Sequence, residues 1–389
     1  MKRYWKLIAL AVFIVGTFGI LYLDHALARD ELPELELVTV SGDETLAENF
    51  VFQGDYRVDP LFQTFKWTQQ DGITYLRDVS ILEKVDGFYR HPIYERLIEE
   101  NRGFMRGKES FIDHFYDDEK EIVQVEPSDS HFKIEVMDKE SKETKEFSVD
   151  IPEQEKMNYI HVYDVQLLNE ILYVVTNNYF ANTQEFHIYE IDLSNESLVQ
   201  HYSAVETAAN NSMTSLSPYY DISAQPFWVF RIDYIEYNEE QYYEEITDTE
   251  IMVHHFATGE TEKIELPEKW ISAFQEVPDN LVSVGDEQIH FYQIAEDEVA
   301  IQSYDVAEKQ LGPVQTIPFE ENLDINNMFA LGDSLYFYAT GGDAENNGKL
   351  IGVNLEKAAI KYEGEIQIKH TTQNIPDHHI EIYDFYAEE

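Results

Sequence analysis

Short runs of alternating apolar and polar residues recur along most of the chain, and this alternation predicts β-strands. Three pairs of runs are joined by two-residue turns, Asn169-Glu170, Gly285-Asp286 and Gly332-Asp333. Such a turn between two alternating runs is typical of a β-hairpin. About twenty residues after each turn lies a third run, namely Ile188–Leu193, Ile301–Val306 and Leu350–Leu355. The pattern therefore predicts a repeated unit built of strands.

The repeat has a period near 49 residues. A fourth copy, Ile251–Gly259, falls between the first two. The four copies align on the residues that open the turn after the third run, Asp192, Phe256, Asp305 and Asn354, at spacings of 64, 49 and 49. We interpret Asp233–Thr249, inside the long interval, as an acidic and tyrosine-rich loop extension. A final run follows in every copy, namely Ser197–Ala204, Glu262–Leu266, Val314–Phe319 and Lys361–Ile368. Each copy therefore predicts four strands.

Four-stranded units of about 40 to 50 residues are typical of β-propeller blades. Weaker copies lie upstream, at Glu36–Asp43, Ser80–Gly87 and Ile134–Ser141. The fold class is therefore predicted to be all-β, a β-propeller of about seven four-stranded blades, with six or eight as alternatives. The last run, His379–Tyr386, is expected to pair with the first blade and close the ring. Two β-sandwiches are the structural alternative, since alternating strands suit both architectures.

In its repeats and turn residues, the chain resembles the broad group of bacterial extracytoplasmic β-propellers. The resemblance covers residues 36–389 and is architectural, so it implies a fold and no narrower family. No WD dipeptide with its GH partner and no kelch double glycine lies in register with the repeat.

One segment interrupts the strand pattern. Tyr94, Leu97 and Ile98 stand at helical spacing, and Pro92 lies just ahead of them, which predicts a helix over Tyr94–Arg106. We define residues 91–108 as the helical insertion. It either caps one end of a blade or binds a partner. Its basic residues, Arg96, Arg102, Arg106 and Lys108, are dense for so acidic a chain, which keeps docking to an acidic surface as the alternative to the capping role.

The amino-terminal segment predicts export. Lys2, Arg3 and Lys6 precede an apolar run without a charge, Leu7–Leu23, and acidic residues follow it. This asymmetry places the amino terminus in the cytoplasm and the remainder outside. Ala26-Leu27-Ala28 has the small-residue spacing of a signal-peptidase site. We therefore expect 1–28 to be a signal peptide or an N-terminal hydrophobic membrane anchor, and 29–389 to be the propeller domain, anchored to the membrane through residues 7–23 or secreted.

The charge balance excludes one class of partner. The 389 residues include 27 Lys plus Arg against 76 Asp plus Glu, which gives a formal net charge of −49. Such a chain repels phosphate backbones, so nucleic acid is not an expected partner. The absence of cysteine excludes disulfides, thiolate zinc sites and a cysteine nucleophile. Hydrophobic residues at 43% and aromatics at 14% nevertheless suffice for a large core.

The candidate metal site is a loop near the carboxyl terminus. Asp343, Glu345 and Asn347 stand at positions 1, 3 and 5 of a calcium-loop pattern, with Gly348 at position 6. Positions 9 and 12 lack the carboxylates that complete such loops, so an ordinary hairpin loop is the alternative. No other cofactor is expected. The pairs His254-His255 and His378-His379 are expected to be structural, because neighbours on a strand point to opposite faces.

Two classes of function remain. No nucleophile elbow, zinc-binding HExxH helix or dinucleotide-binding glycine motif occurs in the sequence. We therefore expect an exported binding or scaffolding protein that contacts a protein or a cell-wall component through Asp233–Thr249 and Tyr94–Arg106. The alternative is a carbohydrate hydrolase or lyase, which would require converging carboxylates with raised pKa values in a central cavity.

Overall fold

A computed structural model provides the structure of the chain. It describes Gly16 and residues 32–58, 61–79, 91–108, 111–128, 130–216, 222–238, 243–276, 282–285, 287–294, 298–318, 323–331, 334–341, 348–355, 357–370 and 379–387. Apart from Gly16, the predicted N-terminal helix at residues 7–23 lies outside these ranges. The helices that they do contain are all too short or too polar to cross a bilayer.

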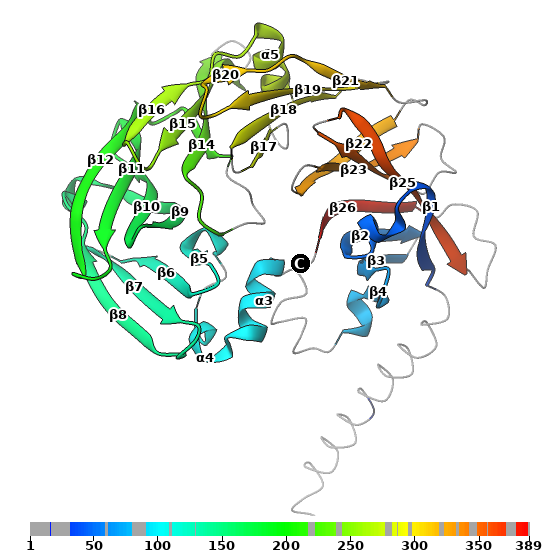
Figure 1. Ribbon diagram of the computed structural model, residues 1–389, viewed down its shortest axis with the longest axis horizontal. Coiled ribbons are helices and arrows are strands. Elements are labelled where there is room, and N and C mark those ends of the chain that lie inside the picture. Colours follow the sequence, from blue (N-terminus) through cyan, green and yellow to red (C-terminus); the bar gives the residue numbers. More distant parts are fainter. Residues whose placement is uncertain are drawn as a thin grey trace, which may run out of the picture. The chain divides into compact units, whose positions relative to one another are not determined.

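The described residues are mostly β and form six antiparallel sheets of four or five strands, which we call A to F (Figure 1). The alternating sequence pattern explains this, because alternate residues on a strand face the core and the solvent. Sequential strands lie side by side in sheets C, D and E, as they do in propeller blades. The predicted number of about seven blades is not confirmed.

The chain divides into two compact units. Unit 1 comprises residues 1–89, 294–299 and 316–389, and unit 2 comprises 90–293 and 300–315. Unit 2 contains sheets C, D and E. Sheet C is formed by β5 (Phe115–Asp117), β6 (Glu121–Pro127), β7 (His131–Asp138) and β8 (Thr144–Asp150). Sheet D is formed by β9 (Tyr159–Leu168), β10 (Ile171–Tyr179), β11 (Thr183–Asp192) and β12 (Ser197–Ala208). Sheet E is formed by β13 (Ser212–Ser215), β14 (Phe227–Asn238), β15 (Tyr243–His255) and β16 (Glu260–Lys263).

The other elements outside sheets C, D and E include sheet F and the helices. Sheet F is formed by β17 (Val282–Val284), β18 (Gln288–Ile294), β19 (Glu298–Asp305), β20 (Gln310–Leu311) and β21 (Gln315–Pro318). The α-helices are α3 (Pro92–Glu100), α4 (Arg102–Met105) and α5 (Glu268–Glu276). The 3-10 helices are η2 (Glu44–Ala47), η3 (Leu76–Asp78), η4 (Ile112–His114) and η5 (Gln154–Lys156).

Unit 1 is formed by strands from both ends of the chain. Sheet A contains β1 (Glu34–Gly42), β25 (Ala359–His370), β24 (Lys349–Asn354), β23 (Ser334–Gly341) and β22 (Leu323–Leu331), in that order. Sheet B contains β26 (His379–Ala387), β2 (Phe50–Val58), β3 (Leu61–Thr68) and β4 (Gly72–Tyr75). The predicted pairing of the last strand with the first sheet is thus confirmed by β26 and β2. The amino-terminal strand β1 in turn pairs with β25, so each end completes a sheet begun by the other.

Most predicted strands are confirmed. The turn Asn169-Glu170 joins β9 to β10, and both residues have positive φ angles, 52° and 68°, as a two-residue hairpin turn requires. The predicted run Ser80–Gly87 lies outside the described residues. Glu36–Asp43 is a strand, but it belongs to the last sheet of the chain and opens none of its own.

The predicted loop extension at Asp233–Thr249 is wrong. Its described residues belong to β14 and β15, which pair from Phe227↔His255 to Asn238↔Tyr243. Tyrosines, isoleucines and threonines in this segment favour extended backbone. Of its carboxylates, Glu236, Glu245 and Asp248 are exposed, whereas Asp233 is buried. High charge was therefore a poor indicator of a loop.

Candidate functional site

The helical insertion lines a pocket together with sheet C. Pro92 occupies the first turn of α3, where its fixed φ suits a helix start and its missing N–H is not needed. The helix ends at Asn101, whose backbone lies at φ −136° and ψ 45°, and α4 follows at once. The single predicted helix over Tyr94–Arg106 is therefore two short helices.

The apolar face of the insertion packs on sheet C. Tyr94, Leu97, Phe104 and Met105 are buried, as their helical spacing predicts. They form one cluster with residues of η4, β5, β6 and β7, including Ile112, Phe115, Ile122 and Met137. This packing confirms that the insertion covers part of a sheet, and it leaves the polar face open for contacts.

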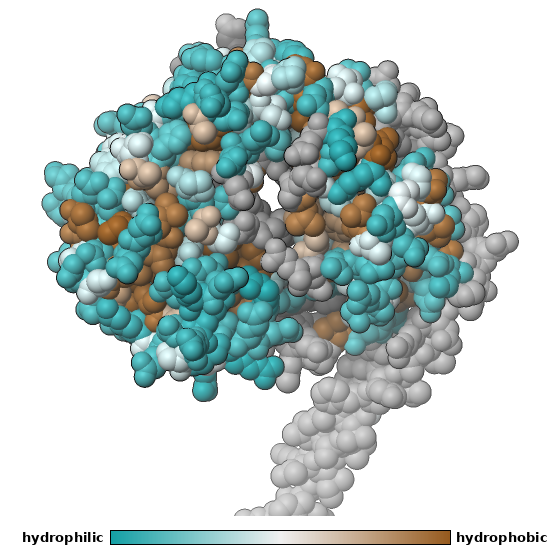
Figure 2. Space-filling view, viewed as in Figure 1, coloured by the Kyte–Doolittle hydropathy of each residue, from teal (hydrophilic) through white to brown (hydrophobic). Residues whose placement is uncertain are grey.

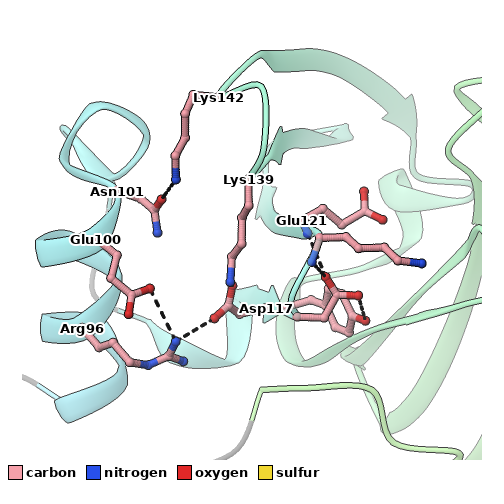
Figure 3. A network of polar contacts seen from close by, with 10 residues as sticks. Arg96, Glu100, Asn101, Asp117, Glu121, Lys139 and Lys142 are labelled. Atoms are coloured by element: carbon pink, nitrogen blue, oxygen red, sulfur yellow. Dashed lines mark hydrogen bonds and ion pairs between the residues drawn. The ribbon is translucent and has the colours of Figure 1, made fainter.

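A buried carboxylate fixes the insertion to sheet C (Figure 3). The side chain of Asp117, at the end of β5, is 4% exposed and faces two cations. Arg96 Nη1 on α3 donates to Asp117 Oδ2 at 3.0 Å, and Lys139 Nζ lies 2.6 Å from Asp117 Oδ1. The exposed Glu100 is a weaker partner of Arg96, at 3.7 Å. A buried carboxylate needs such compensation, because desolvation strongly disfavours its charge.

A pocket of about 430 Å³ lies between the end of the insertion and sheet C. The insertion contributes the stretch from Gly103 to Lys108, apart from Met105, and the sheet contributes Gln124, Glu126, Lys133, Glu135 and Thr144. We call this space the insertion pocket. Three cationic and two anionic side chains line it, so its lining is net positive in a chain of net charge −49.

Lys108 is the most enclosed charge of the insertion pocket. Its side chain is 6% exposed, and its Nζ donates to Gln124 Oε1 and Glu135 Oε2, each at 2.6 Å. The ammonium also lies 4.1 Å from the centroid of the Phe104 ring, a favourable cation–π geometry. Partial burial opposes ionisation of Glu135, but hydrogen bonds from Lys108 and Lys133 hold its pKa below the usual value. The ionised pair fixes a positive group in the pocket wall.

Arg106 is the lining cation that is free to bind. It is exposed, and among the described residues it has no ion-pair partner. Arg102, on α4, is exposed and unpaired within the same ranges, but it does not line the pocket. Hydrophilic residues predominate on much of the visible surface (Figure 2). In a chain of net charge −49, two exposed cations without an ion-pair partner among the described residues mark a distinct electrostatic region. Because Glu126 also lines the pocket, a ligand would present an anion to Arg106 and a hydrogen-bond donor to Glu126.

The sequence also suggested a calcium loop and two pairs of histidines as candidate sites. Asp343, Glu345 and Asn347, the calcium-loop candidates, lie outside the described residues. His254 is buried, and its ring contacts the hydroxyls of Tyr202 at 3.2 Å and Thr261 at 2.9 Å. His255 instead faces Glu262 at 3.2 Å. This pair is therefore structural, on opposite faces of β15, as predicted.

The acidic segment contributes a buried ion pair. Asp233 Oδ2 lies 2.7 Å from Arg231 Nη2, and Asp233 Oδ1 accepts a hydrogen bond from Thr249 Oγ1 at 2.7 Å. These residues join β14 to β15. Asp233 and Thr249, the two ends of the predicted contact element, are therefore hydrogen-bonded to each other across the hairpin.

Carboxyl groups with raised pKa values were the expected sign of an enzyme. Burial raises the pKa of Asp113, in η4, to about 6. Burial also raises the pKa of Glu121, with the charges of Asp118 and Asp138 adding to the effect. Neither residue lines the insertion pocket.

Sequence reasoning identified the basic residues of the insertion but missed the strand residues that face them. Gln124 on β6 and Glu135 on β7 accept hydrogen bonds from Lys108, and Lys133 on β7 donates to the same Glu135. Along β7, Lys133 and Glu135 alternate with the buried residues Phe132 and Ile134. That alternation predicts a polar face, but only the tertiary structure shows what covers it.

Comparison with known proteins gives no family. No protein-family model matches the sequence, and no curated protein matches it. TolB from Acinetobacter baumannii is 10% identical, with 90% of this chain and 66% of that chain covered and a TM-score of 0.31. A prolyl endopeptidase is 9% identical, with 90% and 52% covered and a TM-score of 0.34. A chain of a nidogen/laminin complex is 10% identical, with 86% and 98% covered and a TM-score of 0.30. These β-propeller-like proteins are too distant to indicate a function for this chain.

The first prediction concerns the anchor of the insertion. Asp117→Asn leaves Arg96 and Lys139 without their shared anion and should lower the free energy of unfolding by about 3 kcal/mol. Glu100→Gln is the matched control, because Glu100 contacts the same arginine but is half-exposed, and it should change stability by less than about 0.5 kcal/mol. Urea unfolding measures both. Equal effects of the two substitutions would contradict the role of Asp117.

The second prediction concerns pH. Because the pKa of Asp113 is raised from 3.8 to about 6, the folded state binds this proton more tightly than the unfolded state does. The stabilisation is full below pH 4 and is lost as the pH rises through 6. Asp113→Asn should therefore become more stable than the unsubstituted protein as the pH rises, by about 1–2 kcal/mol at pH 7.5, after allowance for partial exposure. A stability difference that does not vary between pH 4.5 and 7.5 would refute the shift.

Proposed function

We propose that the chain is an exported, membrane-tethered β-propeller that binds or scaffolds a protein or a cell-wall component. The six described sheets are taken as its blades, and residues 7–23 as its membrane anchor. The partner's anionic group enters the insertion pocket. The strand order of the sheets, the pairing of β26 with β2 and the basic-apolar-acidic order of the amino terminus support this proposal.

The observation that carries the binding function is Arg106, which has no ion-pair partner among the described residues and lies beside the enclosed Lys108. An arginine without a partner retains all its donors for a carboxylate or phosphate. Lys108 and Lys133, which Glu135 holds in place, add positive potential to the same wall. The surrounding negative charge would repel an anionic ligand elsewhere, so it directs such a ligand to this pocket.

The third prediction tests the insertion pocket by affinity capture. Cells that produce the full chain are treated with a cross-linker, and the unsubstituted protein is compared with Arg106→Glu and Arg102→Glu. Both substitutions reverse one exposed charge in the same segment, but only Arg106 lines the pocket. Because a charge-assisted hydrogen bond contributes about 1.5–3 kcal/mol, Arg106→Glu should lower recovery of the partner about tenfold or more. Arg102→Glu should leave recovery unchanged, and high salt should release the partner.

Equal recovery with Arg106→Glu would refute the binding role of the pocket. Capture of wall polysaccharide with release of reducing ends would support the alternative function, a carbohydrate hydrolase or lyase. In that case the catalytic carboxylates would have to be sought outside the insertion pocket.

A further inference from the structure

A second group of side chains lies where η4 contacts the first strand of sheet D. Tyr159, His161 and Tyr163 alternate along β9, so their side chains lie on one face of the strand. Phe111 and His114 approach this face from the segment around η4. We call these five residues the ring cluster. None of them lines the insertion pocket.

The rings of the cluster form a continuous series. The ring centroids are 5.3 Å apart for Phe111 and His114 and 6.5 Å apart for His114 and His161. Tyr159 and His161 stack with 16° between their planes, and Tyr163 meets His161 edge-on at 4.9 Å. Two members face solvent, since Tyr159 is 60% exposed and Phe111 is 52% exposed. The cluster therefore presents flat apolar surfaces at its accessible ends.

The two imidazoles have unused hydrogen-bonding capacity. Within the described ranges, neither His114 nor His161 makes a side-chain hydrogen bond, although His114 is only 8% exposed. Burial, together with the neighbouring His161, lowers the pKa of His114 to about 4, and burial also lowers the pKa of His161. At neutral pH each ring is therefore uncharged and offers one N–H donor and one acceptor nitrogen. A partly buried donor or acceptor without a hydrogen-bond partner costs free energy, and a ligand that hydrogen-bonds to it removes this cost.

A carboxyl group lies beside the rings. Asp113 precedes His114 in η4, and no hydrogen bond to its side chain occurs in the described part of the chain. Burial, with a smaller contribution from the charge of Asp113, raises the pKa of Tyr163 to about 12. Asp113 therefore belongs to the same short helix that brings His114 to β9.

We propose that the ring cluster is a binding site for a neutral saccharide. A pyranose ring has an apolar C–H face, which suits Tyr159 and Phe111, and a rim of hydroxyls, which suits His114, His161 and Asp113. Hydroxyls both donate and accept hydrogen bonds, as do neutral imidazoles. The carboxyl group of Asp113 and the net charge of −49 disfavour an anionic sugar. The site is separate from the insertion pocket and takes a ligand of different charge.

The fourth prediction tests the ring cluster by titration of the full chain, held in a detergent that has no sugar headgroup. The probes are chitotriose, cellotriose and maltotriose, with tetramethylammonium as a cationic probe of the same rings. At least one trisaccharide should bind saturably in isothermal titration calorimetry. Tyr159→Ala should raise its Kd about tenfold, because a stacked aromatic contributes about 1–1.5 kcal/mol, while Tyr159→Phe keeps the ring and should change Kd less than about threefold.

Two controls separate this site from other surfaces. Tyr383 is also an exposed tyrosine, at 43%, and Tyr383→Ala should leave the saccharide Kd unchanged. Arg106→Glu should leave it unchanged too, so failure of the insertion pocket and failure of the ring cluster are distinguishable. Thermal unfolding should confirm that Tyr159→Ala still folds, as expected for an exposed side chain. Saturable binding of tetramethylammonium without any trisaccharide, no binding at all, or binding unaffected by Tyr159→Ala would each overturn the proposal.

Discussion

The position of the helical insertion depends on Asp117, and the insertion pocket depends on that position. A carboxylate that is 4% exposed retains its charge only where cations replace the water it has lost. Arg96 from α3 and Lys139 from the end of the β7 hairpin supply those cations, so the ion pairs join the insertion to the first and third strands of sheet C. Apolar packing of Leu97 and Phe104 supplies the hydrophobic stabilisation, and the ion pairs select the orientation.

The same sheet then forms the pocket wall. Lys108 is held against Gln124 and Glu135, which fixes the end of the insertion over β6 and β7. The buried ammonium of Lys108 thus has two acceptors, and these hydrogen bonds hold the end of the insertion against the sheet. The exposed Arg106 differs from these residues, since its charge is not compensated within the described part of the chain. Lys108 and Arg106 are thus close in sequence but differ in burial and in pairing among the described residues.

The sequence pattern predicted the strands well because burial alternates along them. In the first half of β11, the buried Gln184, Phe186 and Ile188 alternate with the partly buried Glu185 and His187. In its second half, residues 188–191 are buried without interruption, and the apolar run Ile188–Leu193 was visible in the sequence. The apolar face of the insertion was also predictable, from the spacing of Tyr94 and Leu97. Local pattern could not show the break at Asn101, or that the acidic segment from Asp233 extends β14 and β15.

The insertion pocket could be predicted only in part. The basic residues of the insertion are conspicuous against the acidic composition, but Lys108 meets Glu135 across 27 residues and Arg96 meets Asp117 across 21. Such contacts are set by how helices and sheets pack, which neither periodicity nor composition records. The ring cluster has the same origin, because His114 in η4 and His161 in β9 are 47 residues apart in sequence and meet only in the folded chain.

The central claim is that an anionic group of the partner binds in the insertion pocket. Hydrogen–deuterium exchange of the full chain, with and without an extract of the cell envelope, tests it most directly. The account predicts slower exchange in residues 103–108 and 133–135, and loss of this protection at high salt. Protection confined to other segments, or protection of these residues that is insensitive to salt, would contradict the account.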